Sequence, residues 1–238
     1  LMEEVVEEQE LKRQSELDAL QSQINPHFLY NTLDSVIWMI EDEQNDGAVY
    51  MIKELSKLLR ISINKGSSLI TIRDEIRHAE SYMNIQKLRY KDQFTCQFQI
   101  DEEILDCCTI KLVVQPLIEN AINYGVQGMY DDGEILVRGY RQGNHVYLEV
   151  SDNGCGMSEE QIENVFRDTT KEAVIPSNAP EKKGNGVGLR NVNTRIQMQF
   201  GQEYGIQIFS ELGEGTTMRI HLPYLSYQKA MESMGRKV

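Results

Sequence analysis

The stretch Gln115–Gly125, QPLIENAINYG, decides the fold together with two glycine-rich stretches further along the chain. Within it, Glu119, Asn120 and Asn123 form a polar cluster on an otherwise apolar predicted helix. A side-chain carbonyl is a hard oxygen ligand that can hold Mg²⁺ together with the phosphates of a nucleotide. The alternative interpretation is a polar helix end that is closed by a C-cap at Gly125.

The second stretch is DNGCGM, which starts at Asp152 and follows a strand predicted over 146–150. An aspartate at the end of a strand can accept a hydrogen bond from an adenine amino group. Gly154 and Gly156 would let the backbone approach the adenine ring closely. The alternative is an ordinary turn, since Asp-Asn-Gly is a frequent turn sequence.

The third stretch, GNGVGLRN, contains Gly184, Gly186, Gly188 and Leu189 and opens a helix predicted over 188–200. The backbone amides and the positive dipole end of such a helix bind phosphates. A Rossmann interpretation fails because no strand immediately precedes the glycines. The polar stretch before them is suited to folding over a nucleotide as a lid.

A histidine near the N-terminus forms a separate constellation in the segment INPHFLYNTLD. His27, Asn31 and Asp34 follow one another at helical spacing and should share one exposed face. Imidazole is a good nucleophile near neutral pH, and an amide or carboxylate neighbour can fix its tautomer. The alternative is an ordinary surface histidine. The apolar seam of this helix is expected to be Leu29, Leu33, Val36 and Ile40.

Helices are predicted for most of the first ninety residues. A second periodic segment spans 48–64, after a polar turn at 41–47, and a third helix opens near Thr71, with Glu75 assisting its first turn, and reaches about Tyr90. Two long helices joined by a short polar turn form a hairpin, which needs a partner to cover its seam. The buried faces are expected to be Ile52, Leu55 and Leu59 in the second segment, and Ile72, Ile76, Ala79 and Met83 in the third.

The rest of the chain alternates between strands and helices. Strands are expected over 94–100, 135–140, 146–150, 204–210 and 216–222, and an apolar helix over 110–124. The fold class is therefore α+β, with mostly antiparallel strands after a helical region. We predict a linker helix over 1–22, a helical domain over 23–90, a mixed domain over 91–225, and a C-terminal tail over 226–238.

Composition excludes several classes of protein. The net charge of −13 argues against nucleic-acid binding, because the chain cannot neutralise phosphates wholesale. No apolar run is long enough to span a membrane, and the acidic N-terminus does not resemble a signal peptide. We expect the four cysteines to be free thiols in a reducing cytoplasm, because they lack the spacing of a zinc site.

The order of these motifs resembles that of a known superfamily. The three stretches look like the N, G1 and G2 boxes of the gyrase–chaperone–histidine kinase ATPases, and Gly213–Thr217 looks like their further glycine-threonine element. INPHFLYNTLD together with QPLIENAINYG is similar to the LytS/YesM type of bacterial sensor histidine kinase. The resemblance implies a helical dimerisation domain that carries a phosphorylated histidine, and an α/β sandwich that binds Mg-ATP.

The resemblance also implies residue roles. His27 would be the phosphoacceptor, Asn120 the Mg²⁺ ligand and Asp152 the adenine contact. Asn31 could position a water for the reverse, dephosphorylating reaction, and Glu119 or Asp34 could assist His27. The remaining nucleotide contacts would come from Asn123, Tyr124, Gly154, Gly156, Gly184, Gly186, Gly188, Leu189, Thr216 and Thr217.

Three positions depart from the common pattern of the superfamily. Phe28 follows His27, where the commonest histidine kinases have an acid that acts as general base. Pro116 stands where ATP-hydrolysing relatives have a glutamate, so transfer to histidine should be preferred over hydrolysis. Asn123 stands where the family usually has a basic residue, which would weaken one phosphate contact.

The resemblance further implies partners. The expected partners are a second copy of the chain in a four-helix bundle, the aspartate of a response-regulator receiver domain, and an upstream sensor in the membrane. The chain would then be the cytoplasmic portion of a membrane protein. Two alternatives are a serine or threonine kinase of the anti-sigma type and a non-catalytic dimeric scaffold that binds ATP.

Overall fold

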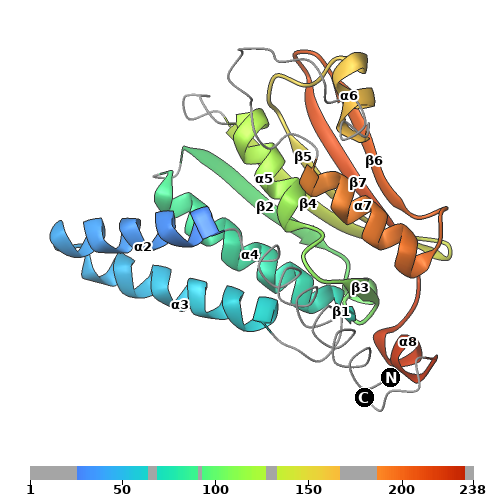
Figure 1. Ribbon diagram of the computed structural model, residues 1–238, viewed down its shortest axis with the longest axis horizontal. Coiled ribbons are helices and arrows are strands. Elements are labelled where there is room, and N and C mark those ends of the chain that lie inside the picture. Colours follow the sequence, from blue (N-terminus) through green and yellow to red (C-terminus); the bar gives the residue numbers. More distant parts are fainter. Residues whose placement is uncertain (1–25, 64–68, 91–92, 127–132, 167–186, 234–238) are drawn as a thin grey trace, which may run out of the picture.

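The computed structural model describes residues 26–63, 69–90, 93–126, 133–166 and 187–233 and contains a five-stranded sheet (Figure 1). The strand order is β2-β4-β5-β7-β6, in which β2 and β4 are parallel and the other neighbours are antiparallel. The expected strands are confirmed, most of them with one or two more residues at their ends. They are β2 Phe94–Ile100, β4 Gly133–Gln142, β5 His145–Asp152, β6 Gly205–Glu211 and β7 Gly215–Pro223.

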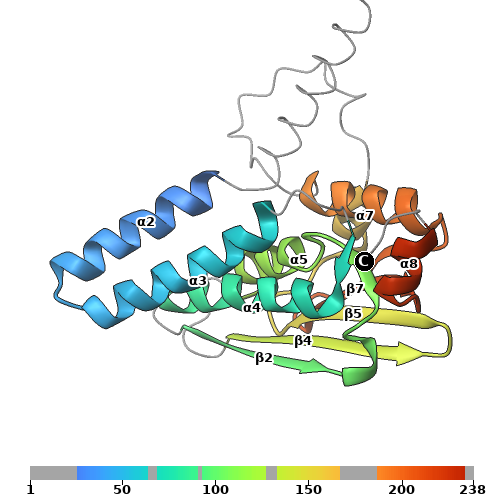
Figure 2. The same ribbon diagram turned by 90° about the horizontal axis from the view of Figure 1, so that it is seen from below.

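Within the described residues, helices cover one face of this sheet and leave the other open (Figure 2). Buried and exposed side chains alternate along β2 and β7, as they do when one face of a sheet meets a core and the other meets water. Figure 2 shows α5, α7 and α4 on the same side of the strands. The helices and short elements of this part are η1 Glu102–Ile104, α5 Gln115–Asn120, the π-helical turn η2 Ala121–Val126, α6 Glu159–Phe166, α7 Val187–Phe200 and α8 Tyr227–Ser233.

Three further helices pack beside this layer. They are α2 Pro26–Glu41, α3 Asn45–Ile63 and α4 Ile72–Arg89. The predicted hairpin is confirmed: α2 and α3 are joined by a turn shorter than the expected 41–47, and Gly47 lies inside α3. The expected N-terminus of α4 is also confirmed, because Thr71 caps it by accepting a hydrogen bond from the backbone N–H of Asp74 at 3.1 Å.

The buried face of α2 differs from the predicted seam. The residues that face α3 and α4 are Phe28, Thr32 and Val36, whereas Leu33 and Ile40 are 48% and 53% exposed. The helix is apolar on more than one side, so the periodicity of its apolar residues allowed two solutions. The intramolecular core takes one side and leaves the other side exposed.

The buried face of α3 is confirmed in part, since Leu55 is buried and Leu59 packs partly buried against the core as expected. Met51, Leu55 and Leu58 are buried, while the expected Ile52 is 49% exposed. In α4 the expected face is correct, since Ile72, Ile76, Ala79 and Met83 are all buried.

The helix predicted over 110–124 starts too early, although residues 115–124 are helical as expected. Residues 108–110 instead form the strand β3 Cys108–Ile110, which pairs antiparallel with β1 Leu69–Thr71, and α5 starts only at Gln115 after a bend. An uninterrupted apolar run is compatible with a buried strand as well as a helix, and periodicity alone does not separate them.

The division into a helical and a mixed domain at residue 90 stays a prediction. In the described residues one contiguous apolar core joins α2, α3 and α4 to the sheet and its helices. Within the same residues, no helix combines the length and the apolar content needed to cross a membrane.

Candidate nucleotide site

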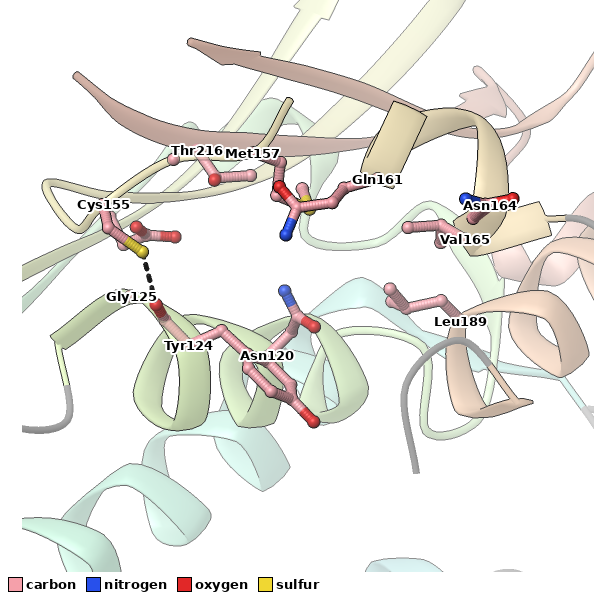
Figure 3. A pocket seen from close by; sticks show the side chains of 12 residues that line it. Asn120, Tyr124, Gly125, Cys155, Met157, Gln161, Asn164, Val165, Leu189 and Thr216 are labelled. Carbon is pink, nitrogen blue, oxygen red and sulfur yellow. Dashed lines mark hydrogen bonds between the residues drawn. The ribbon is translucent and has the colours of Figure 1, made fainter. Parts of the chain in front are cut away.

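A cavity of about 290 Å³ lies between the covered face of the sheet and the helices α5, α6 and α7 (Figure 3). Such a volume suits part of a small ligand, and sites of this kind combine apolar walls with a few polar groups. Residues from all three stretches that the sequence analysis singled out line this cavity, namely Asn120, Asp152 and Leu189. The lining residues are Asn120, Tyr124, Gly125, Asp152, Cys155, Gly156, Met157, Gln161, Asn164, Val165, Leu189 and Thr216.

The structure separates the three polar residues of the first stretch. Asn120 ends α5, and its amide points into the cavity toward Gln161 (Figure 3). Glu119 lies outside the cavity, where its carboxylate accepts a hydrogen bond from Gln115 at 2.8 Å. Asn123 is exposed and does not line the cavity. The three side chains therefore do not form one cluster at the cavity, because the adjacent Glu119 and Asn120 point about 100° apart and Asn123 lies in the π-helical turn η2.

Gly125 is a packing residue and not the predicted C-cap, because η2 continues to Val126. A Cβ atom at Gly125 would lie 2.5 Å from the side chain of Asp152, and one at Gly154 would lie 2.3 Å from the carbonyl oxygen of Gly125. The helix and the turn after β5 thus approach each other backbone to backbone, which only glycine permits. This contact closes one end of the cavity.

Asp152 is the one carboxylate among the cavity residues and is the last residue of β5. Burial raises the pKa of its carboxyl from 3.8 to about 6, and the backbone N–H groups of Gly154 and Thr216 offset part of that rise. The bond from the Gly154 N–H measures 3.0 Å. Above pH 6 the site therefore holds a buried hydrogen-bond acceptor with negative charge, which suits an amino group as ligand.

The two threonines of the last stretch lie on opposite faces of β7, as successive residues of a strand must. Thr216 is 7% exposed, lines the cavity beside Asp152, and shares a hydrogen bond of 2.8 Å with the Ser210 hydroxyl. Thr217 points to the other face, where its hydroxyl lies 2.8 Å from that of Ser151. Only Thr216 is placed to contact a ligand in this cavity.

The wall formed by α6 was missed in the sequence. Gln161, Asn164 and Val165 come from this helix, and Met157 comes from the turn before it. A signal was present: the Ser158 N–H donates to Gln161 Oε1 at 2.8 Å, and the Gln161 N–H donates to the Ser158 hydroxyl at 3.3 Å. This is the reciprocal bonding of a capping box, in the sequence Ser-Glu-Glu-Gln.

An exposed thiol also lines the cavity. Cys155 Sγ lies 3.5 Å from the carbonyl oxygen of Tyr124, the contact drawn in Figure 3. The next residue, Gly156, has a φ of 67°, and a Cβ atom there would overlap the carbonyl oxygen of Glu211. Glycine at this position is thus required by the backbone rather than by a ligand.

The third stretch is placed only in part. Gly184 and Gly186 lie outside the described residues. Gly188 is exposed in the first turn of α7, and the buried Leu189 lines the cavity opposite Met157 and Val165.

The histidine constellation lies on another part of the molecule. His27 is exposed in the first turn of α2, and the Asn31 amide nitrogen lies 3.1 Å from its Nδ1 and 3.3 Å from its Nε2. Asp34 is exposed, so the expected shared face exists. None of these three residues lines the cavity, so a ligand would have to meet His27 through movement of the chain or through a second copy.

The donor set of the cavity fits an adenine nucleotide with Mg²⁺. Met157, Val165 and Leu189 provide apolar walls for a flat ring, and Asp152 provides an acceptor for an exocyclic amine. The Asn120 amide supplies one hard oxygen ligand, and Mg²⁺ normally completes its shell with phosphate oxygens and water.

Comparison with known proteins agrees with this geometry. The histidine kinase family model matches residues 15–94, and the model of the histidine kinase-, DNA gyrase B-, and HSP90-like ATPases matches residues 108–226. The chain is 37% identical over 223 residues to the sensor histidine kinase YesM of Bacillus subtilis, covering 94% of this chain and 36% of that protein. It is 35% identical over 215 residues to the sensor histidine kinase YpdA of Escherichia coli, covering 90% and 35%.

A solved structure with similar coverage is the histidine kinase domain of the blue-light activated histidine kinase EL346 from Erythrobacter litoralis. It is 16% identical, covers 96% of this chain and 98% of that one, and has a TM-score of 0.47. The chain spans about a third of the length of the curated relatives it matches. By its two matching segments, the chain belongs to the histidine kinase-, DNA gyrase B-, and HSP90-like ATPase family and, within it, to the sensor histidine kinases.

Proposed function

We propose that this chain is the cytoplasmic kinase region of a two-component sensor, and that it transfers the γ-phosphoryl group of ATP to His27. The observation that carries the proposal is the cavity that unites Asn120, Asp152 and Leu189 from three distant parts of the sequence. Its chemistry suits an adenine nucleotide, and the same chain presents an exposed imidazole whose ring is held by an amide.

The cavity holds ATP with the adenine ring at Asp152 and the phosphates near α7. The ionised Asp152 accepts a hydrogen bond from the adenine amino group, beside Thr216, while Met157 and Leu189 pack on the ring. Asn120 holds Mg²⁺, which when bound neutralises charge on the phosphates. The phosphates extend toward the N-terminus of α7, where Gly188 offers a backbone amide. Asn123 and Tyr124 lie in the middle of η2, and Tyr124 lines the cavity.

Transfer to His27 follows as an in-line displacement. One imidazole nitrogen forms the new bond to phosphorus, the bond to the bridging oxygen breaks, and ADP leaves with the electron pair. Asn31 can fix the tautomer, because an amide oxygen turned toward Nδ1–H leaves the Nε2 lone pair free to attack. The same amide could position a water for the reverse reaction.

The ring gives up a proton after the attack, and two carboxylates are candidates to receive it. Asp34 is exposed seven residues after His27 on the same helix. Glu119 has a carboxyl whose pKa is raised by burial, with hydrogen bonds from Gln115 and Tyr82 offsetting part of the rise. A Glu119→Gln variant with an unchanged rate of phosphorylation would remove Glu119 from consideration.

The exposed apolar residues of α2 and α3 support a homodimer. Tyr30, Leu33, Ile37 and Trp38 are all at least 48% exposed, and α3 adds Ile52 at 49%. Monomeric soluble proteins rarely expose a contiguous apolar area of this kind. Two copies that join these faces would form a four-helix bundle.

The further partners are assigned by analogy with the relatives. An aspartate of a response-regulator receiver domain would accept the phosphoryl group from His27. A membrane-embedded sensor would precede the acidic residues 1–22.

The test is incubation with γ-labelled ATP, comparing the wild type with His27→Ala. We expect an acid-labile label in the wild type and none in the variant, because phosphohistidine hydrolyses in acid. An acid-stable label would instead favour a serine or threonine kinase of the anti-sigma type. Nucleotide binding without any label would favour a non-catalytic scaffold.

A further inference from the structure

A carboxylate of α4 is buried at the entrance to α5. Glu75 is 0% exposed and accepts hydrogen bonds from three successive backbone N–H groups. Its Oε2 receives the Leu112 N–H at 2.8 Å, and its Oε1 receives those of Val113 and Val114 at 2.7 and 2.9 Å. Burial raises the pKa of this carboxyl, and the three donors together with Arg195 offset part of the rise.

The segment that Glu75 holds has little support of its own. Leu112 has a φ of 59°, a left-handed conformation that costs energy in a residue other than glycine. Val114, the N-cap of α5, provides no side-chain cap, and proline occupies one of the first helical positions. The carboxylate of Glu75 therefore supplies from another helix the acceptors that the start of α5 lacks.

A second helix holds the same segment from the other side. Arg195 of α7 donates a hydrogen bond to the carbonyl oxygen of Lys111 at 2.6 Å. Helix α7 also carries Leu189, and α5 ends in Asn120, so the held segment joins two walls of the nucleotide cavity.

Helix α4 contacts α5 at a second point, two turns further on. Tyr82 is 3% exposed, and its hydroxyl accepts a hydrogen bond from the Gln86 amide. It also lies close enough to the Glu119 carboxyl, next to Asn120, to oppose the rise in pKa that burial causes there. Its ring lies 4.9 Å from that of Phe28, next to His27. Ala79 lies between Glu75 and Tyr82 on the same face and is completely buried, which lets the two helices approach closely.

We propose that α4 sets the metal-binding half of the nucleotide site by holding α5 at Glu75 and Tyr82, so that Glu75 is a positioning residue for Asn120. Because Tyr82 also touches Phe28, the same helix links the environment of His27 to that of Asn120. The adenine contact should depend less on this arrangement, since Asp152 belongs to a strand in the middle of the sheet and meets η2 at Gly125, five residues beyond Asn120.

The test rests on the proposed nucleotide site and uses ADP as the probe. Isothermal titration calorimetry gives the dissociation constant of ADP with Mg²⁺ and with excess EDTA, for the wild type and for Glu75→Gln. Glutamine keeps the size of the side chain but offers one acceptor oxygen to three donors. We expect the affinity with Mg²⁺ to fall about 10-fold or more, the usual effect of losing a residue that orients a metal ligand. The affinity in EDTA should stay within about twofold.

The matched control is Glu80→Gln, which removes an exposed carboxylate from the same helix and should change neither constant. Tyr82→Phe is the second variant, because it keeps the ring against Phe28 and should still fold. It should also lower the affinity with Mg²⁺ more than the affinity in EDTA. If Glu75→Gln does not fold, the affinities of Tyr82→Phe with Mg²⁺ and in EDTA test whether α4 positions the metal-binding half of the site.

The outcomes separate the two proposals. If Glu75 had only a structural role, Glu75→Gln would lower thermal stability and either weaken ADP binding equally with Mg²⁺ and in EDTA or leave both affinities unchanged. Either result would overturn the inference. Equal constants in Tyr82→Phe and the wild type would do the same. A wild type that binds no ADP in either buffer would instead contradict the proposed function.

Discussion

Replacing Asp152 by asparagine should stabilise the protein near neutral pH while weakening nucleotide binding. Burial raises the pKa of this carboxyl from 3.8 to about 6, so the folded state holds its proton more tightly than the unfolded state does. A group with a raised pKa contributes stability below its unfolded pKa and loses it as the pH rises through the folded pKa. Keeping Asp152 ionised at pH 7.5 therefore costs stability.

The size of the effect follows from the shift. A rise from 3.8 to about 6 corresponds to about 3 kcal/mol, at 1.36 kcal/mol for each pH unit. Asparagine has one acceptor oxygen in place of two, and giving up one of the two backbone hydrogen bonds costs about 1 kcal/mol. The net gain for Asp152→Asn should therefore be about 2 kcal/mol at pH 7.5. It should disappear at pH 4, where the folded wild type is already protonated.

Urea unfolding of the nucleotide-free wild type and Asp152→Asn at pH 7.5 and pH 4 measures both quantities. Calorimetric titration with ATP should show affinity about tenfold lower in the variant at pH 7.5, because a neutral acceptor replaces a charged one. Wild-type affinity should also fall as the pH drops below about 6. A variant that is less stable than the wild type at pH 7.5 would refute the assignment of a desolvated, ionised carboxylate.

Three other predictions follow from accessible groups. Bound ATP should slow alkylation of Cys155, which is exposed and lines the cavity. The buried Cys108, whose pKa burial raises to about 11, should react slowly with or without ATP. Equal protection of both thiols by ATP would indicate a stabilisation of the whole fold and not a ligand beside Cys155. Trp38→Glu should shift the chain toward monomers in light scattering, because it puts a charge into a side chain that is 71% exposed on the apolar face of α2; an unchanged dimer would place the interface elsewhere. Asn31→Ala should lose dephosphorylation but only slow phosphorylation of His27, because Asn31 also helps to fix the tautomer of the ring; decay of the label measures dephosphorylation, and an unaltered decay would remove Asn31 from that step.

Local signals in the sequence were sufficient for the sheet and for part of the site. The alternation of apolar and polar residues predicted β2. The Gln-Gly-Asn sequence predicted the hairpin between β4 and β5, which turns at Gly143 with a φ of 62°. The predicted start of α4 near Thr71 is also found, and Thr71 caps this helix. Asp152 and Asn120 were both placed at the cavity. In each case a short pattern has a direct backbone consequence.

Features that depend on tertiary packing were not predictable in the same way. Glu75 looked like a helix-cap residue, and its three donors lie 37 to 39 positions away in the sequence. The role of Gly125 depends on the approach of Asp152, which no local pattern reports. The seam of α2 was misplaced because the helix has two apolar sides, and only the packing of Phe28 on Tyr82 chooses between them.

Mass spectrometry at neutral pH tests the central claim most directly, by locating the phosphoryl group after incubation of the chain with Mg-ATP. The peptide that contains residues 24–34 should carry one phosphoryl group on the imidazole of His27. A chain that binds ATP but carries its phosphoryl group on a serine or threonine, or on another histidine, would contradict the account.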